Sequence, residues 1–150
     1  MSEPWNYDTV MTPADRVLTW LMRINAVMLL FAVVAVFFPT DLMAECNTHL
    51  GLEPFHRSPL TEYLTRSISA MYAMHGAMVL AISTDVRRYR PLIRWVYVMH
   101  LTFAVTMVGI DLYAGMPTHW IMGEGGTIGT VAIAALLVNR WAIRSETAGE

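Results

Sequence analysis

Residues 17–38 read VLTWLMRINAVMLLFAVVAVFF, a stretch that is almost wholly apolar. Three similar stretches follow at residues 68–82, 95–110 and 120–138, and short polar segments marked by proline separate them. A helix needs about 20 mainly apolar residues to cross the hydrocarbon of a bilayer. The sequence therefore predicts an all-α fold, a four-helix transmembrane bundle.

The composition favours one small membrane domain over residues 1–150. Hydrophobic residues make up 55% of the chain and charged residues 15%, whereas an ordinary soluble domain has about a quarter charged residues. A soluble helical bundle remains the alternative, since the second and third apolar stretches are shorter than an ideal span. The chain has no basic face of the kind that binds nucleic acid, so we expect no nucleic-acid partner.

Cys46 is the only cysteine, which excludes an internal disulfide and C-x-x-C redox chemistry. The first fifteen residues carry acidic but no basic side chains, unlike the positive start of a secretory signal. We therefore expect the first helix to be retained in the mature protein.

Capping residues predict where the helices begin. The expected N-caps are Thr12, Ser58 and Thr118, and Pro13, Pro59 and Pro91 stand where a first helical residue is expected. The predicted helices are residues 13–38, 59–83, 91–115 and 118–143. In the long connection 39–58, residues 41–50 are expected to form a short interfacial helix.

The orientation follows from a basic cluster between the second and third spans, formed by Arg87, Arg88, Arg90 and Arg94. Short positive loops stay in the cytoplasm. An even number of spans then places both termini in the cytoplasm as well. We expect these four arginines to bind lipid headgroups.

Several polar residues fall inside or close to the spans, namely Arg23, Asn25, His75, His100, Asp111 and Glu124. An unpaired charge near the centre of a span costs about 2.5 to 3.5 kcal/mol, so these side chains should face protein or water. At about 1.5 Å per residue, Asp111 and Glu124 lie about 6 and 9 Å below the outer ends of their helices, and His75 about 10 to 13 Å.

These three residues are therefore expected to share a polar pocket in the outer half, with Tyr72, His119 and Arg66 nearby. Such a pocket suits binding a cation, relaying protons or positioning a headgroup. The alternative is structural: Arg66 pairs with one carboxylate, and His75 hydrogen-bonds a neighbouring helix. Arg23 is expected to reach lipid phosphates or to pair with Asp85.

No cofactor is assigned from the sequence. A haem held by His75 and His100 would need both at one level, and His100 is expected to lie much deeper. A second possible metal cluster lies in the outer loop, but its spacing matches no standard zinc pattern. Its members are Glu45, Cys46, His49, Glu53 and His56.

Gly125 and Gly129 form a GxxxG step that lets another helix approach closely. We expect the partner to be the second helix, which carries small residues at 70, 73, 76 and 77. Contact with another subunit is the alternative.

Residues 62–67, 72–76, 85–91, 109–111, 115–117 and 124–125 read EYLTRS, YAMHG, DVRRYRP, GID, GMP and EG. Together they resemble a group of small bacterial membrane proteins that is described only as uncharacterised. The resemblance covers roughly residues 58–126. It implies a four-span fold and assigns no catalytic residues.

The leading expectation is a non-catalytic accessory or scaffolding subunit of a larger membrane assembly, with membrane lipids and other membrane subunits as partners. A complete catalytic constellation is missing from the sequence. The alternative is a small membrane enzyme or carrier that works through His75, Asp111 and Glu124. A haem-containing redox subunit is a third possibility.

Overall fold

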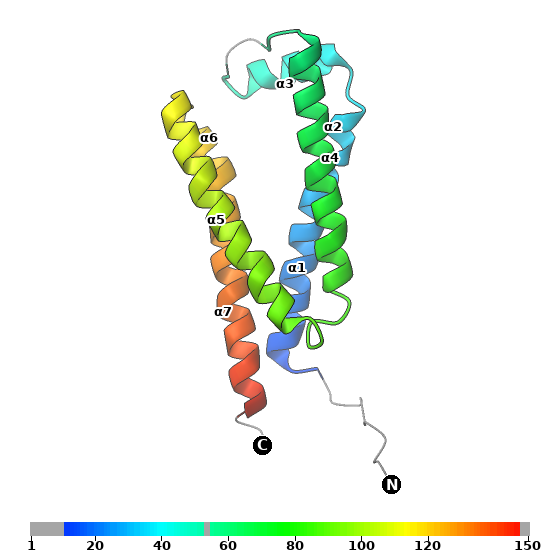
Figure 1. Cartoon of the computed structure of the whole chain (residues 1–150), viewed down its shortest axis with the longest axis vertical. Helices are drawn as coiled ribbons and strands as arrows, with labels where there is room; N and C mark the ends of the chain where they lie inside the picture. Colours follow the sequence, from blue (N-terminus) through cyan, green and yellow to red (C-terminus); the bar gives the residue numbers. More distant parts are fainter. Residues whose placement is uncertain (1–10, 53–54, 148–150) are drawn as a thin grey trace.

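The computed structural model describes residues 11–52 and 55–147, and over these residues the chain is all-helical, as predicted (Figure 1). The helices are α1 (Pro13–Phe31), α2 (Val33–Val36), α3 (Thr40–His49), α4 (Pro59–Ile82), α5 (Arg90–Ala114), α6 (Thr118–Ile121) and α7 (Thr127–Thr147), with a π-helical turn, Met122–Gly126, between α6 and α7. The predicted interfacial helix is thus confirmed as a helix, α3.

Two of the predicted helix starts are capped as expected. The hydroxyl of Thr12 accepts from the backbone N–H of Asp15, and the carboxylate of Asp15 accepts from the backbone N–H of Thr12, which makes a capping box. Ser58 accepts from the backbone N–H of Thr61. The third expected cap is wrong: Pro117 holds the N-cap position in an extended conformation, and Thr118 is already the first helical residue.

Three helical segments are long and apolar enough to cross a membrane: Pro13–Val36, Arg90–Ala114 and Thr118–Ser145. They contain 24, 25 and 28 residues. Helix α4 has 24 residues, so its length is similar, but its first half is more polar. By length and composition, the structure therefore supports a membrane protein with three candidate spans.

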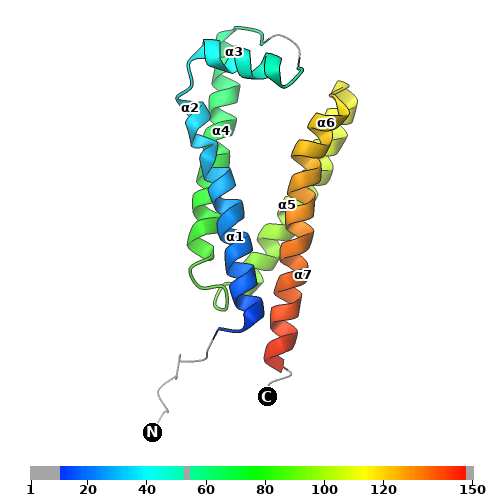
Figure 2. The same ribbon diagram turned by 180° about the vertical axis from the view of Figure 1, so that it is seen from behind.

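The long helices are arranged as two antiparallel pairs, α1 with α4 and α5 with α7 (Figures 1 and 2). The pairs meet near the two chain ends and diverge toward the end that carries α3 and α6. Where they meet, a buried apolar core includes Leu18, Met22, Val79, Ile93 and Ala132. This core joins all four long helices.

Glycines set the closest approach within each pair. A Cβ atom at Gly76 would lie 2.8 Å from the backbone oxygen of Ala26, so α4 touches the backbone of α1. A Cβ atom at Gly125 would lie 2.5 Å from a methyl group of Val108 on α5, and one at Gly129 would lie 3.6 Å from Ala104. The predicted partner of the GxxxG step is therefore wrong, because the second helix packs on α1 and the glycines of the last helix pack on α5.

Helix α3 lies across the diverging ends and reaches α6. Met43 on α3 is buried, whereas Leu42 and Leu50 are exposed. At the far end of α3, the ring nitrogen Nε2 of His119 lies 2.9 Å from the carbonyl oxygen of Leu50. This contact helps to connect the two helix pairs at the end where they diverge.

Replacement of Gly76 by alanine tests the packing of α1 on α4. The added methyl group meets rigid backbone, so G76A should lower the free energy of unfolding by about 1 to 3 kcal/mol. The matched control is G109A on α5, where an added Cβ has no neighbour within 4 Å and should raise stability by up to about 1 kcal/mol. The helical circular dichroism signal, followed during unfolding in detergent, measures the stability of both variants. Equal changes in stability in G76A and G109A would contradict this packing.

Candidate functional site

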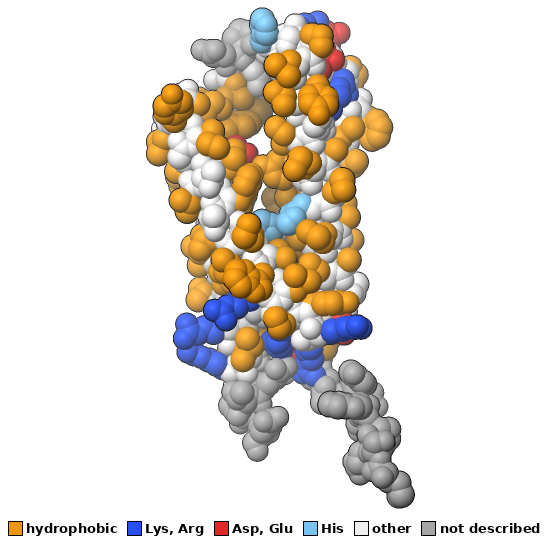
Figure 3. All heavy atoms as spheres, in the orientation of Figure 1, with side chains coloured by type: hydrophobic (Ala, Val, Ile, Leu, Met, Phe, Trp, Pro, Cys, Tyr) orange, Lys and Arg blue, Asp and Glu red, His pale blue; other side chains and the backbone are white. Residues whose placement is uncertain are grey.

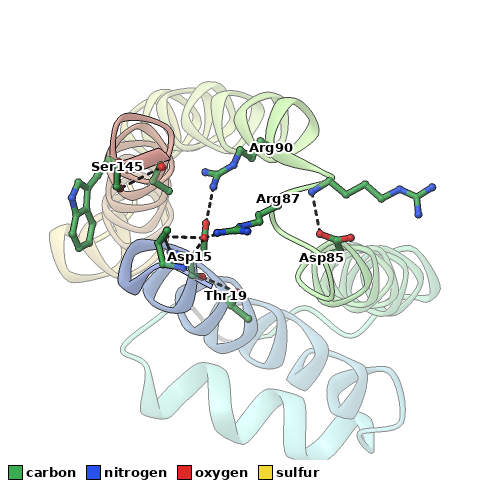
Figure 4. A network of polar contacts seen from close by, with 10 residues as sticks. Asp15, Thr19, Asp85, Arg87, Arg90 and Ser145 are labelled. Carbon is green, nitrogen blue, oxygen red and sulfur yellow. Dashed lines mark hydrogen bonds and ion pairs between the residues drawn. The ribbon is translucent and has the colours of Figure 1, made fainter. Parts of the chain in front are cut away.

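A buried ion network ties the start of α1 to the start of α5 (Figure 4). The Asp15 side chain is 0% exposed, and its two oxygens accept from Arg87 Nε at 3.0 Å and Arg90 Nη2 at 2.7 Å. The hydroxyl of Thr12 donates to the same carboxylate at 2.8 Å. Asp15 therefore acts both as part of the helix cap and as the anion that holds two arginines.

This network corrects part of the prediction for the basic cluster. Arg87 and Arg90 bind Asp15 inside the protein, whereas Arg88 and Arg94 are exposed, and their contact with lipid headgroups stays a prediction. Arg87 and Arg90 are turned inward because the 83–89 connection passes over the first turn of α1, which carries the buried carboxylate of Asp15.

The expected pairing of Arg23 with Asp85 is replaced by other contacts. Asp85 accepts from the backbone N–H of Arg88 at 3.0 Å. The Arg23 guanidinium lies 6.0 Å from the ring centre of Trp20, a neighbour on the same helix. Arg23 is exposed, which is consistent with the other expectation, contact with lipid phosphates.

A histidine pair lies at the middle of the molecule. Nε2 of His75 on α4 and Nε2 of His100 on α5 are 2.8 Å apart, and the two rings are nearly perpendicular, at 84°. The buried Tyr97 ring lies 5.2 Å from the His100 ring, and its hydroxyl is 3.5 Å from the side-chain nitrogen of Asn25. The alternative that His75 hydrogen-bonds a neighbouring helix is therefore confirmed.

The expectation that His100 lies much deeper than His75 is wrong. Helices α4 and α5 run antiparallel from the same connection, and the two histidines lie about two and about three turns from it. A neutral imidazole offers one donor and one acceptor, so one Nε2 donates to the other. An iron held by both rings would have to lie between these two nitrogens, which instead bond to each other.

The acidic pocket, formed by Tyr72, Asp111, Trp120 and Glu124, lies between the diverging pairs. The Tyr72 hydroxyl donates to Glu124 Oε1 at 3.4 Å. Trp120 and Asp111 also lie close enough to Glu124 to interact with it electrostatically. Figure 3 shows an opening between the two halves, above the pale blue histidines, in which an acidic side chain is visible.

The π-helical turn Met122–Gly126 positions Glu124. Such a turn adds one residue to the helical repeat and is frequent at functional sites. Gly125 within it allows close contact with α5, the helix that carries Asp111. The turn therefore places Glu124 within electrostatic range of Asp111, which lies on a different helix.

The structure thus brings together three of the six residues predicted for the pocket: Tyr72, Asp111 and Glu124. His75 binds His100 one level lower, and His119 is exposed at the Leu50 carbonyl. Arg66 donates to the backbone carbonyls of Val36 and Phe38, so the alternative in which it pairs with a carboxylate is also replaced. Its two contacts hold the end of α2 against α4.

Trp120 was missing from the predicted pocket residues, although it lies near Glu124. Its spacing was nevertheless informative, since Trp120 and Glu124 are separated by the i, i+4 step that brings two side chains onto one helix face. The pairing of His75 with His100 had no comparable signal.

The possible metal cluster in the outer loop is not assembled by the residues that the structure describes. His49 Nδ1 lies 2.9 Å from the carbonyl oxygen of Glu45 on its own helix, and Glu53 lies outside the described residues. Throughout residues 11–52 and 55–147, no group of three or more His, Cys, Asp or Glu is placed to hold a metal ion.

Comparisons with known proteins identify no relative that could assign a role to this site. No protein-family model, curated protein or solved structure matches the chain. The chemistry of the acidic pocket is therefore argued from its own side chains.

Replacement of Asp15 by asparagine tests the ion network. Two arginines then lose their buried anion, so D15N should lower the free energy of unfolding by about 3 to 5 kcal/mol. The matched control is D41N, which breaks the exposed ion pair of Asp41 with Arg57 and should change stability by at most about 1 kcal/mol. Denaturation in detergent compares the two, and a D15N variant as stable as D41N would contradict the role of the network.

Proposed function

We propose that the chain crosses a bacterial inner membrane four times, with both termini in the cytoplasm. The fourth crossing would be α4, which is as long as the recognised segment Pro13–Val36 and packs along it. Most of the blue side chains visible in Figure 3 gather around the end that carries the start of α1 and the end of α7. The positive-inside rule places that end in the cytoplasm.

The outward faces of the long helices support this placement. Large apolar side chains are exposed on each of them, among them Phe31 at 73%, Met71 at 70%, Val105 at 68% and Leu137 at 62%. Soluble monomers rarely expose apolar patches larger than a few hundred Å². Lipid tails would cover these faces, which disfavours the soluble-bundle alternative.

We further propose that the acidic pocket binds a cation or an exchangeable proton in the outer half of the membrane. The observation that carries this proposal is that Asp111 and Glu124, two acidic residues from different helices, lie within electrostatic range of each other, while Asp111 is 4% exposed and its buried Oδ2 has no hydrogen-bond partner in the described part of the chain. Two like charges side by side disfavour each other's ionised form. One positive charge, taken up by the pair, removes that repulsion.

The residues that lie below the pocket favour a closed binding site over an open channel. Beneath it lie the His75–His100 pair and the hydrogen bond from Asn25 to Tyr97. Below these, Leu18, Met22, Val79 and Ile93 close the middle of the helix arrangement with side chains that are fully buried. The polar groups therefore lead from the outer end to mid-depth and stop at an apolar core.

A role as an accessory subunit is the second candidate function. Gly109 and Gly123 favour it, because an added Cβ at either one would find no atom within 4 Å, in contrast to Gly76 and Gly125. These two glycines leave flat helix surface against which no described part of this chain packs. Another membrane subunit could pack closely there.

Stability measurements test the binding function. A ligand that binds the folded state stabilises it by about 1.4 kcal/mol for each tenfold rise in concentration above Kd. The wild type should therefore unfold at higher temperature when either sodium or proton concentration is raised. The variants D111N and E124Q should lose this dependence, while D41N keeps it. Equal dependence in all four proteins would contradict a binding role for the pocket.

Purification in mild detergent tests the accessory role. The wild type should co-purify with another membrane protein in a fixed ratio. G123L should weaken that association without loss of stability, because the added side chain meets nothing within this chain. A wild-type protein that is purified alone, as a monomer, would contradict the accessory role and leave the pocket proposal standing.

A further inference from the structure

We infer that the acidic pocket binds an organic cation, a substituted ammonium group that carries apolar substituents. This inference rests on the proposed function and deepens it, because it names the chemical class of the cation. Its basis is the combination of aromatic rings, acidic residues and a sideways opening at one place in the structure.

Three aromatic residues from three helical segments lie at or next to the acidic pocket. The Tyr72 hydroxyl on α4 donates to Glu124 Oε1 at 3.4 Å. The Phe103 ring on α5 contacts the Tyr72 ring edge to face, with 6.3 Å between the ring centres and 72° between the ring planes. Trp120 on α6 lies close enough to interact with Glu124. The faces of such rings attract a cation within about 6 Å, and proteins recognise quaternary ammonium ligands in this way.

The acidic residues of the pocket are held by no arginine in the part of the chain that the structure describes. Asp111 is 4% exposed, and its buried Oδ2 atom has no hydrogen-bond partner there. The arginine at this end of α4, Arg66, donates to the backbone carbonyls of Val36 and Phe38 instead. A buried polar group without a partner is disfavoured. A cation bound beside Asp111 and Glu124 would supply the missing partner.

The side chains around the pocket suit an ammonium ion better than a metal ion. Calcium and magnesium ions take about six to eight oxygen ligands at short distances. Within residues 11–52 and 55–147, no group of three or more His, Cys, Asp or Glu is placed to hold a metal ion. An ammonium ion with apolar substituents needs no such set of ligands, because the acidic residues and the ring faces attract its charge without fixed coordination.

The opening beside the pocket gives such a ligand a route from the membrane. It lies on a side face of the molecule, between the diverging helix pairs, and an acidic side chain is visible in it (Figure 3). Helix α3 lies across the diverging ends, where His119 Nε2 is 2.9 Å from the Leu50 carbonyl oxygen. In the proposed placement the side opening faces lipid tails. These tails can dissolve the apolar substituents while the positive charge reaches the acidic residues.

Binding of benzyltrimethylammonium to the full-length protein in detergent, measured by isothermal titration calorimetry, tests the inference. The wild type should bind this cation more tightly than sodium. It should not bind neopentylbenzene, in which a carbon atom replaces the charged nitrogen. E124Q should weaken the binding of benzyltrimethylammonium by about tenfold or more, because the partner of the cation loses its charge. D41N, in which the acidic residue of an exposed ion pair is replaced, should bind like the wild type.

The variant F103L tests the aromatic contribution separately, because it removes a ring and keeps an apolar side chain. Its affinity for benzyltrimethylammonium should fall about 2- to 30-fold, which corresponds to a cation–π contact of about 0.5 to 2 kcal/mol. The matched control is F31L, which removes the exposed ring of Phe31 on α1 and should leave the affinity unchanged. Equal affinity in F103L, F31L and the wild type would overturn the inference.

The results separate this inference from the proposed function. Binding of benzyltrimethylammonium that depends on Glu124 and Phe103 supports both. Stabilisation by sodium or protons that depends on Glu124, without binding of benzyltrimethylammonium, would overturn the inference and leave the proposed function standing. Benzyltrimethylammonium that binds E124Q as tightly as the wild type would also overturn the inference, since its binding would not need the pocket. Failure of the wild type to respond to any of these cations would contradict both.

Discussion

A charge surrounded by apolar side chains must find its partner within the protein, and this constraint governs each buried charged contact of the structure. Asp15 shows it most clearly. Its fully buried carboxylate is shared between Arg87 and Arg90, so the first turn of α1 is tied to the connection after α4 and to the start of α5. The same residue completes the helix cap with Thr12. One carboxylate thus positions both helix pairs at the end where they meet.

The other end of the molecule is organised differently, and this difference is the basis of the proposed function. There the pairs diverge, and the contacts between them include the hydrogen bond from Tyr72 to Glu124 and the contact of His119 with the Leu50 carbonyl at the end of α3. Asp111 and Glu124 lie within electrostatic range of each other, and in the described part of the chain neither is held by an arginine. An anion that is neutralised by arginine stabilises the fold, whereas an acidic pair without that neutralisation attracts a cation or a proton.

Features that depend on one helix at a time were predicted from the sequence. The cap at Thr12, the all-α fold and α3 follow from local patterns and apolar length. Features that depend on how two helices face each other were not. The sequence paired Gly125 with the second helix, but the turn Met122–Gly126 and Ala104 place it on α5. Equally, periodicity along α4 and α5 cannot show that His75 and His100 meet, because their alignment depends on the connection between these helices.

Orientation in the membrane decides whether the acidic pair opens to the outside, and the single native cysteine can report it. Cys46 on α3 is exposed and lies at the end opposite the chain termini. A membrane-impermeant maleimide added to cells with a permeabilised outer membrane should label Cys46 directly. In the double variant C46S/T84C, whose cysteine lies in the connection between α4 and α5, labelling should require disruption of the inner membrane. The reverse pattern, or recovery of the protein without membranes, would contradict the proposed placement.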